Sequence, residues 1–431
     1  MRRLLAVLVV VFPPLVAAGE TPFFDLTRYN DFPEFESYIR GVARMNPDIV
    51  HMRLIGFSRE HRPLLGLKVI RVLAEYQWGI DFPGIFLKFI DKLPVSPTDY
   101  RLVVPPTTLS QLFGSMAVIM HVNGRRSMSQ STLSRRRLLM LQENFSSSFP
   151  ITNITWSPNM DNYHLFQLIH NYGIDEKITS YINLLDIYVF PVLNPDGFIF
   201  SRTSRKSMIR QWRKNRAPTN CSGYTALAKN ICCEGVDLNR NYDLGFSQKN
   251  YPFNNPCSDE FQGPFPFSEP ESRAVRDFVL SHEIYGRLHA LVSMHTHGQL
   301  WILPYNHHKR TYPEDFRELE SLATRAADKV YSYRETKYRI GTAADMLGTA
   351  TGGATDWIKK NTPTKYVYVL ELPPDMSTWF AFQIKPHWLI PIGKETWMGI
   401  KVILDQVIEE TINEPRRRVA AAAATTFRVS N

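Results

Sequence analysis

Short apolar runs rich in β-branched residues alternate with longer amphipathic stretches along this chain. Residues 185–192, 290–295 and 366–372 have the composition of buried strands, and residues 271–282 and 313–333 have the periodicity of helices. Such alternation favours an α/β domain in which helices flank a mixed or largely parallel central sheet. We therefore predict a single α/β domain.

Polar side chains stand where these predicted strands end. His295 closes one run, Glu371 closes another, and Asn194 and Asp196 follow the third. Ligands of open α/β sheets bind beyond the carboxyl ends of the strands, so these four residues are candidates for a functional site. A lone histidine at such a position is more often structural than functional, so the candidates gain weight only from other residues nearby.

Two internal stretches and the C-terminal end lack this periodicity. Residues 70–115 and 121–162 mix proline-rich, serine-rich and arginine-rich pieces, and loops of that length are uncommon inside a compact domain. Residues 410–431 contain an arginine triplet beside an alanine run, which predicts a low-complexity, disordered tail. The predicted main domain spans residues 24–409, with the two internal stretches as its atypical parts.

Residues 1–19 have the layout of a cleaved signal peptide. Two arginines precede an apolar run from Leu4 to Val16, and small residues follow the run. An anchoring helix is the alternative, but the run is short for a membrane span and contains Pro13 and Pro14. We therefore expect a secreted, extracellular protein without a membrane partner.

All four cysteines lie close together in the sequence. Cys221, Cys232, Cys233 and Cys257 form an even cluster, which in a secreted chain predicts two disulfide bonds. A zinc site is the competing interpretation, but the window has no paired C-x-x-C units and contains no histidine. The cysteines thus agree with secretion.

The formal net charge of +9 would suit a nucleic-acid partner or an anionic surface. Much of the excess, however, lies in arginine clusters within the irregular stretches, at 125–137 and 416–418. The charge therefore gives no support to a nucleic-acid partner.

Motifs elsewhere in the chain add further polar candidates to His295 and Glu371. Arg213 lies in RQWRKNR, Asn239 and Arg240 lie in GVDLNRNYDLGF, and Glu371 ends YVYVLE. The same series includes FDLTRYNDFPEF from Phe24, PVLNPDGF from Pro191, PCSDEFQGPFPFSEPES from Pro256, HTHGQLWILPY from His295 and GGATDW from Gly352. In this order the segments resemble the metallocarboxypeptidases of the zinc carboxypeptidase family, the group of the pancreatic A-type and B-type enzymes. The resemblance covers most of residues 24–69 and 174–409.

The resemblance implies an exopeptidase that releases C-terminal residues from peptides, with one zinc ion as cofactor. In such enzymes the metal lowers the pKa of bound water to about 7, and a carboxylate takes the proton. Glu371 matches the family's general base, Arg213 matches the arginine that stabilises the oxyanion, and His295 matches one zinc ligand. Asn239 and Arg240 match the pair that binds the substrate's terminal carboxylate, for which a guanidinium fork is suited.

The resemblance also implies a specificity and a disulfide pairing. Thr355 stands at the pocket-floor position that is acidic in enzymes preferring Lys or Arg, so we expect aliphatic or aromatic terminal residues. Cys233 and Cys257 match the family's common disulfide, which leaves Cys221 and Cys232 as an additional pair.

Two residues depart from the family's pattern around the substrate. His297 replaces the tyrosine that follows the zinc histidine by two positions, and Gly348 stands where an alignment without gaps puts the mobile tyrosine. Both departures put the capping of a bound substrate in doubt. The partners that the resemblance implies are the C-termini of peptides or proteins.

The family's first two zinc ligands are missing from the sequence as written. They come from an H-x-x-E motif, in which one turn of chain brings an imidazole and a carboxylate to the same metal. None of the 12 histidines is followed by a glutamate three residues later. Where the motif belongs, within Met116–Ser129, the chain has Asn123 and Arg126, and an arginine would repel the metal. His295 alone would not hold zinc tightly.

A change of reading frame offers one explanation of this gap. If the third base of each codon is read with the first two bases of the next, Met116–Ala117 gives Gly and Met120–His121 gives Ala. The neighbouring junctions permit the rest of GGNHAREWP, which contains the missing motif. We therefore hypothesise that residues from Ser115 to about Asn162 include frame-shifted or unspliced coding sequence.

Genuine loss of zinc is the alternative. The chain would then be a pseudoenzyme that binds peptide C-termini through Asn239, Arg240 and Arg213, or a secreted interaction protein that reuses the fold. The retained Glu371 argues against both alternatives, since a binding module has little use for a buried general base.

Overall fold

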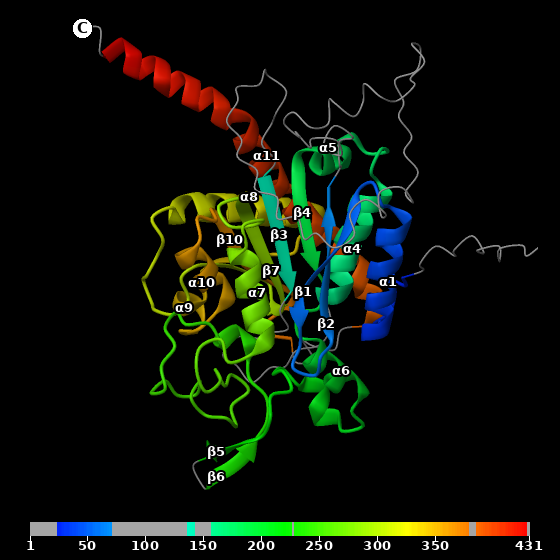
Figure 1. The fold of residues 1–431 in the computed structure, drawn as a ribbon, viewed down its shortest axis with the longest axis vertical. Helices are drawn as coiled ribbons and strands as arrows, with labels where there is room; N and C mark the ends of the chain where they lie inside the picture. Colours follow the sequence, from blue (N-terminus) through cyan, green and yellow to red (C-terminus); the bar gives the residue numbers. More distant parts are fainter. Residues whose placement is uncertain (1–23, 71–135, 143–156, 226–227, 379–384, 429–431) are drawn as a thin grey trace, which may run out of the picture. The chain divides into compact units, whose positions relative to one another are not determined.

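An eight-stranded mixed sheet lies at the centre of the described residues (Figure 1). The computed structural model describes residues 24–70, 136–142, 157–225, 228–378 and 385–428, and gives the backbone alone for 136–142, 157–161, 207–208 and 412–428. The strands follow the order β1 (Val50–Phe57), β2 (Pro63–Val69), β4 (Leu185–Phe190), β3 (Arg136–Gln142), β7 (Leu288–Gly298), β10 (Tyr366–Asp375), β8 (Leu300–Leu303) and β9 (Arg339–Thr342).

Parallel pairing occupies the middle of this sheet, and antiparallel pairs flank it. β3 runs parallel to β4 and β7, and β7 runs parallel to β10. β2 runs antiparallel to both β1 and β4, and β8 runs antiparallel to β10. The predicted α/β class with a mixed central sheet is confirmed.

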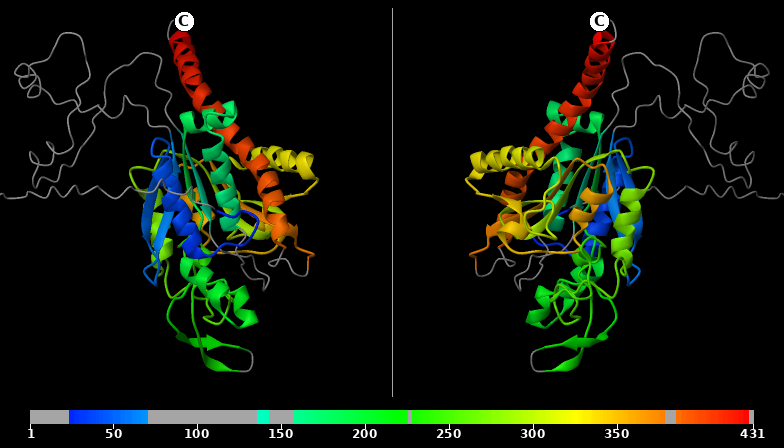
Figure 2. Two further views of the ribbon diagram at one scale, coloured as in Figure 1. Left: turned by 90° about the vertical axis from the view of Figure 1, so that its right-hand side faces the viewer. Right: turned by 90° about the vertical axis from the view of Figure 1, so that its left-hand side faces the viewer.

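Helices cover both faces of the sheet, as strands that are apolar on both sides require. One face packs against α1 (Phe32–Met45), α4 (Ser157–His170), α5 (Glu176–Leu184), α8 (Phe316–Arg334) and α11 (Leu389–Arg428), and the other against α7 (Pro270–Leu280) and α10 (Ala354–Asn361) (Figure 2). Alternate side chains of β4 divide between the two cores. Ile187 and Val189 join the first, whereas Tyr188 and Phe190 join the second.

The strongest sequence patterns correspond to elements of the fold. The three predicted strands are β4, β7 and β10, and the two predicted helices are α7 and α8. Two elements lie within residues 121–162, which the sequence left without periodicity: strand β3, and the start of α4. The predicted signal peptide and almost all of residues 70–115 lie outside the described residues.

The C-terminal segment, for which composition predicts a disordered tail over residues 410–431, has a helical backbone as far as Arg428. The backbone of α11 continues helically from Leu389 through the alanine run to Arg428. Alanine has the highest helix propensity, and the run extends a helix whose earlier turns, up to Val407, are buried against the sheet. The first part of α11 is therefore stabilised by packing against the sheet, and the helix propensity of the alanine run favours its continuation.

The remaining described elements are short. They are α6 (Pro195–Thr203), α9 (Ala343–Met346), the 3-10 segments η2 (Ser207–Gln211), η3 (Leu238–Arg240) and η4 (Pro386–Trp388), and a hairpin of β5 (Asn220–Tyr224) and β6 (Lys229–Cys233). Disulfides join Cys221 to Cys232 and Cys233 to Cys257, the pairing that the resemblance implies. No helix among the described residues is long and apolar enough to cross a membrane.

A buried acidic network ties the turn between β1 and β2 to the start of α7. Glu271 is 1% exposed and accepts hydrogen bonds from the Arg59 backbone N–H (3.0 Å) and the Asn215 side chain (3.2 Å). Asn215 also donates to Glu269 Oε2 (2.7 Å), which forms an ion pair with Arg59. Burial raises the pKa of the Glu271 carboxyl to about 7.

The free energy of unfolding is expected to decrease as the pH rises, because of the Glu271 carboxyl in this network. Between the ordinary carboxyl pKa of 4.5 and the raised value of about 7, the folded chain binds a proton at Glu271 that the unfolded chain has released. The stabilisation is complete below pH 4.5 and is lost as the pH rises through 7. Glu271→Gln should therefore flatten the pH dependence of the free energy of unfolding, by a few kcal/mol at most.

Urea unfolding at pH 5, 6, 7 and 8 measures this difference. Glu409→Gln, at an exposed position of α11, serves as the matched control and should keep the slope of the unaltered chain. An equal slope in the Glu271→Gln variant would contradict the assignment of the proton to Glu271.

Candidate active site

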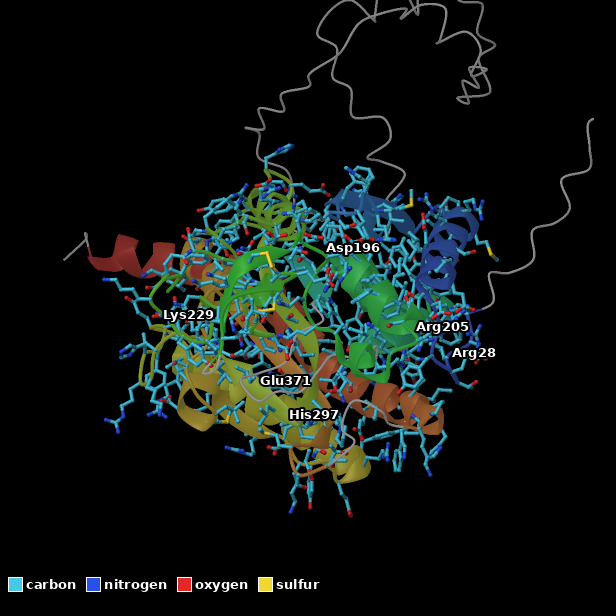
Figure 3. The ribbon with its side chains drawn as sticks, turned by 90° about the horizontal axis from the view of Figure 1, so that it is seen from below. Arg28, Asp196, Arg205, Lys229, His297 and Glu371 are labelled. Carbon is cyan, nitrogen blue, oxygen red and sulfur yellow. A yellow bond between two sulfur atoms is a disulfide. The ribbon has the colours of Figure 1, made fainter. Side chains whose placement is uncertain are left out.

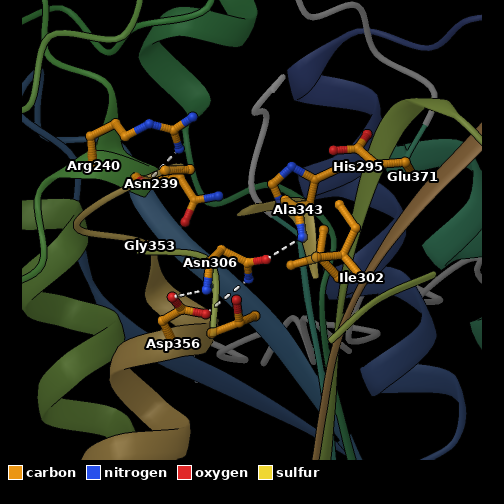
Figure 4. Close-up of a pocket in the computed structure, with 12 residues that line it drawn as sticks. Asn239, Arg240, His295, Ile302, Asn306, Ala343, Gly353, Asp356 and Glu371 are labelled. Atoms are coloured by element: carbon orange, nitrogen blue, oxygen red, sulfur yellow. Dashed lines mark hydrogen bonds between the residues drawn. The ribbon is translucent and has the colours of Figure 1, made fainter. Parts of the chain in front are cut away.

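Two neighbouring parallel strands bring the candidates His295 and Glu371 together. They are register partners in β7 and β10, so their side chains leave the sheet side by side. Both line a pocket that Asn239, Arg240 and Thr355 also line (Figure 4). Residues far apart in sequence thus meet at the carboxyl ends of the strands, where open α/β sheets bind ligands.

Glu371 carries a buried carboxyl group. It is 3% exposed, and its Oε2 atom forms no hydrogen bond with any described residue. Burial raises the pKa of its carboxyl to about 8, although the positive charges of Arg213 and Arg240 act in the opposite direction. A poised, unpartnered carboxyl group of this kind is suited to exchange a proton with a ligand.

Arg213 is fixed in the interior beside this carboxylate. Its guanidinium forms an ion pair with Asp237, with Nε 2.8 Å and Nη2 2.6 Å from Oδ2, and both side chains are almost fully buried. The Asn194 side chain donates to the backbone carbonyls of Arg213 and Lys214 (both 3.3 Å), which anchors the segment. The guanidinium is therefore a preorganised positive charge.

Asn239 and Arg240 occupy the opposite side of the pocket from Glu371 in Figure 4. Asn239 Oδ1 accepts from the Ala354 N–H (2.8 Å), while its Nδ2 forms no hydrogen bond with a described residue. Arg240 donates through Nη2 to Glu260 (3.0 Å) and through Nη1 to the Asn239 carbonyl oxygen (3.0 Å), and its Nε is buried without a partner among the described residues. The two side chains therefore keep donors available for an anion.

A glycine allows the backbone to pack closely here. Gly352 has a φ of +68°, and a Cβ atom at this position would lie 2.1 Å from the Arg240 carbonyl oxygen. Only glycine tolerates both the left-handed conformation and this approach, so Gly352 holds the segment before α10 against η3.

The floor of the pocket contains residues that sequence reasoning missed. Thr355 lines the pocket, and Asn306 and Asp356 line it too. Asp356 adjoins Thr355 in the GGATDW motif, which was a usable signal. Asn306 follows β8 across a loop, and no local pattern marks its side chain as part of a pocket.

Two strand-end candidates do not line this pocket. Asn194 caps α6 by accepting from the Gly197 N–H (3.0 Å), and Asp196 forms an ion pair with Arg62 and accepts from the Ser58 hydroxyl. Figure 3 shows Asp196 apart from Glu371. Both residues follow β4, and β3 lies between β4 and β7 in the sheet. The sequence therefore placed both residues at the end of a strand, but that strand end does not border the pocket.

The described residues do not by themselves fit a zinc ion. They contain no group of three or more His, Cys, Asp or Glu side chains arranged to hold a metal, and His295 stands as one imidazole beside a buried carboxyl. Structural and catalytic zinc sites use at least three protein ligands. The position of the missing motif, Met116–Ser129, lies outside the described residues, as does most of the hypothesised frame-shifted segment.

The pocket thus brings a buried carboxyl and a histidine at parallel strand ends together with a buried arginine, in a protein of the α/β class. The family model described as zinc carboxypeptidase matches residues 155–399, which is more than half of the chain. The chain therefore belongs to the zinc carboxypeptidase family.

Curated relatives agree with this membership. The chain is 36% identical to carboxypeptidase A2 of Rattus norvegicus over 241 residues, which are 56% of this chain and 53% of the relative. It is 32% identical to carboxypeptidase B of Astacus astacus over 251 residues, 58% of this chain and 76% of the relative. The chain spans about half the length of the first curated relatives it matches.

Solved structures share the fold. Bovine thrombin-activatable fibrinolysis inhibitor, in complex with a tick carboxypeptidase inhibitor, superposes with a TM-score of 0.63 at 22% identity, covering 89% of this chain and 99% of that one. Carboxypeptidase A from Helicoverpa armigera superposes with a TM-score of 0.64 at 23% identity, covering 91% and 76%. These likenesses support the α/β carboxypeptidase fold.

Proposed function

We propose that this protein is an exopeptidase that removes C-terminal residues from peptides. The observation that carries the proposal is the pocket itself, in which a buried carboxyl at Glu371 faces the donors of Asn239 and Arg240. A pocket closed at one end by a fixed positive charge suits a chain end with a free carboxylate and excludes internal segments. Membership of the zinc carboxypeptidase family supports the same reaction.

Each polar residue then has a role that its surroundings support. Asn239 and Arg240 bind the terminal carboxylate, because both side chains line the pocket and neither Asn239 Nδ2 nor Arg240 Nε donates to a described residue. Arg213 stabilises the negative charge that develops on the scissile carbonyl, since its ion pair with Asp237 fixes the guanidinium in advance. Glu371 accepts the proton of the attacking water, a role that its position beside His295 in the pocket supports.

Specificity and location complete the proposal. Thr355 gives the pocket floor no charge, which favours aliphatic or aromatic terminal residues over basic ones. The apolar N-terminal segment and the two disulfides favour a secreted protein that acts on extracellular peptides or proteins.

A second candidate function rests on the metal. The family implies one zinc ion at His295, yet the sequence has no H-x-x-E pair, and the described residues contain no group of three ligands. With the residues as written, the protein would bind peptide C-termini without cleaving them, either as a pseudoenzyme or as a secreted interaction protein. In this second function Asn239 and Arg240 would still bind the terminal carboxylate, but Glu371 would not act as a general base.

Sequencing of the transcript across the codons for residues 70–171 separates the two candidates first. We then expect the chain as written to show little or no hydrolysis of a blocked peptide with a free C-terminus. A version with Met116–Gly124 replaced by GGNHAREWP should hydrolyse the peptide, and a chelator should abolish that activity. If the chain as written hydrolysed the peptide robustly and a chelator abolished that activity, the conclusion that it lacks the zinc pair would be wrong. Inactivity of a folded, zinc-loaded restored version would overturn the proposed reaction.

A further inference from the structure

The walls and the floor of the pocket differ in chemistry. Ile302 of β8 and Val369 of β10 are register partners and form one apolar wall, and Ala343 and Ala350 complete the lining with small side chains. The floor is polar, with Asn306 beside Asp356 (Figure 4), and Thr355 also lines the pocket. The cavity volume is about 50 Å³, so the space that these residues leave for a ligand side chain is small.

The Asn306 carboxamide bridges two helices at the floor. Its Nδ2 donates to Asp356 Oδ1 (2.9 Å) in α10, and its Oδ1 accepts from the Ala343 N–H (2.6 Å) at the start of α9. Its backbone N–H also donates to Asp356 Oδ2 (2.5 Å). The carboxamide cannot turn aside for a larger ligand without breaking both side-chain hydrogen bonds and leaving buried polar atoms unpaired.

The negative charge of Asp356 is already engaged by these neighbours. Besides the two donors of Asn306, its Oδ2 accepts from the His307 N–H (3.1 Å) and lies 3.2 Å from His307 Nδ1. The carboxylate therefore has little capacity left for a cationic side chain of a ligand, although it lines the pocket.

Thr355 leaves one polar group of the floor open. The side chain is 5% exposed, and its hydroxyl makes no hydrogen bond with a described residue. A hydroxyl can donate and accept, so it can pair with an amide at the end of a short ligand side chain. An apolar side chain, aliphatic or aromatic, would bury this hydroxyl without a partner, so the hydroxyl favours glutamine, and the exclusion of an aromatic ring rests on Asn306.

We propose that Asn306 is a specificity-determining residue that shortens the pocket and restricts it to terminal residues with short, uncharged side chains, of the size of leucine or glutamine. The inference rests on the proposed binding of a C-terminus at Arg240 and Asn239. It narrows the expected preference, because Asn306 excludes the aromatic side chains that a neutral Thr355 alone would admit.

Binding of one blocked tripeptide series to the full-length chain tests the proposal without requiring turnover. The peptides differ only in the last residue, which is Leu, Gln, Phe or Lys, and each is also made with an amidated C-terminus. By calorimetry the Leu and Gln acids should bind at least about tenfold more tightly than the Phe and Lys acids. Tightest binding of the Phe acid would overturn the proposal.

Substitutions at the floor of the pocket test which residue determines the preference for the terminal residue. Asn306→Gly should raise the ratio of Phe to Leu affinity at least about tenfold, because the pocket deepens by the volume of a carboxamide. Thr355→Val should remove any advantage of Gln over Leu and leave Phe excluded. Asn361→Gly, in an exposed residue at the end of α10, is the matched control and should change neither ratio.

The amidated peptides distinguish failure of the specificity role of Asn306 from failure of the proposed binding of a C-terminus. If the acids bind more tightly than the amides but Asn306→Gly leaves the Phe to Leu ratio unchanged, the specificity role of Asn306 is wrong and C-terminus binding stands. If no acid binds better than its amide, C-terminus binding fails and the inference falls with it. Should Asn306→Gly unfold, as judged by its thermal transition, the ranking in the unaltered chain and in Thr355→Val decides the question.

Discussion

Replacing Glu371 by glutamine is expected to remove nearly all hydrolysis in the version of the chain that carries the zinc pair. Loss of a positioned general base costs about 10²–10⁴-fold in rate. Glutamine keeps the size of the side chain but cannot accept the proton. We expect kcat to fall while KM and the zinc content remain close to their original values, as measured by steady-state kinetics and elemental analysis.

Glu395→Gln is a matched control for this change. Glu395 is also almost fully buried, at 1% exposure, and its carboxyl accepts from the Thr336 hydroxyl (2.8 Å) away from the pocket residues. This variant should retain turnover. A Glu371→Gln variant with full turnover would refute the role of Glu371, and loss of zinc from it would point to a structural role instead.

Replacing Arg240 by glutamine is expected to abolish the preference for a free C-terminus, in the chain as written as well as in the restored version. Arg240 is 3% exposed and is the charged member of the candidate carboxylate site. Truncating one partner of a buried, hydrogen-bonded charge pair costs about 2–5 kcal/mol. The affinity ratio between a peptide acid and its amide should therefore fall by about 100-fold.

Two further variants separate binding from folding. Arg216→Gln removes a half-buried arginine that pairs with Glu234 outside the pocket, so it should leave the acid-to-amide ratio unchanged. Arg240→Gln combined with Glu260→Gln avoids leaving the Glu260 carboxylate unpaired, and should restore stability without restoring binding. A folded Arg240→Gln chain that still prefers the acid would exclude Arg240 from the carboxylate site.

The second candidate function predicts a different pattern from the same variants. A zinc-free binder would lose its preference for acids on Arg240→Gln but would tolerate Glu371→Gln. Because Glu371 is buried at a raised pKa and pairs with no described residue through Oε2, its retention is costly unless the site uses it. That cost favours the enzyme over the binder.

Local patterns were sufficient for the elements that build the sheet and for the side chains that motifs mark. The apolar runs of β4, β7 and β10 are long and rich in β-branched residues, so they predict buried strands without tertiary information. His295 and Glu371 could be proposed from the same pattern, because the end of a strand in an α/β sheet has a fixed relation to the ligand site.

Pairing across the sheet and between helices was decided only by the tertiary structure. That β7 lies next to β10, and that β3 separates β4 from both, depends on packing between distant segments, so Asn194 and Asp196 could not be excluded from the pocket by sequence. Helix α11 continues where composition suggested a tail, since its earlier turns are held against the core.

The sequence by itself determined the fold class and the family, and it named candidates for the site, because these follow from periodicity and from motifs of adjacent residues. The depth and polarity of the pocket followed only from the tertiary structure. Asn306 acts at the floor through hydrogen bonds to Asp356 and Ala343, residues 50 and 37 positions away, and such contacts form only when α9 and α10 pack beside β8.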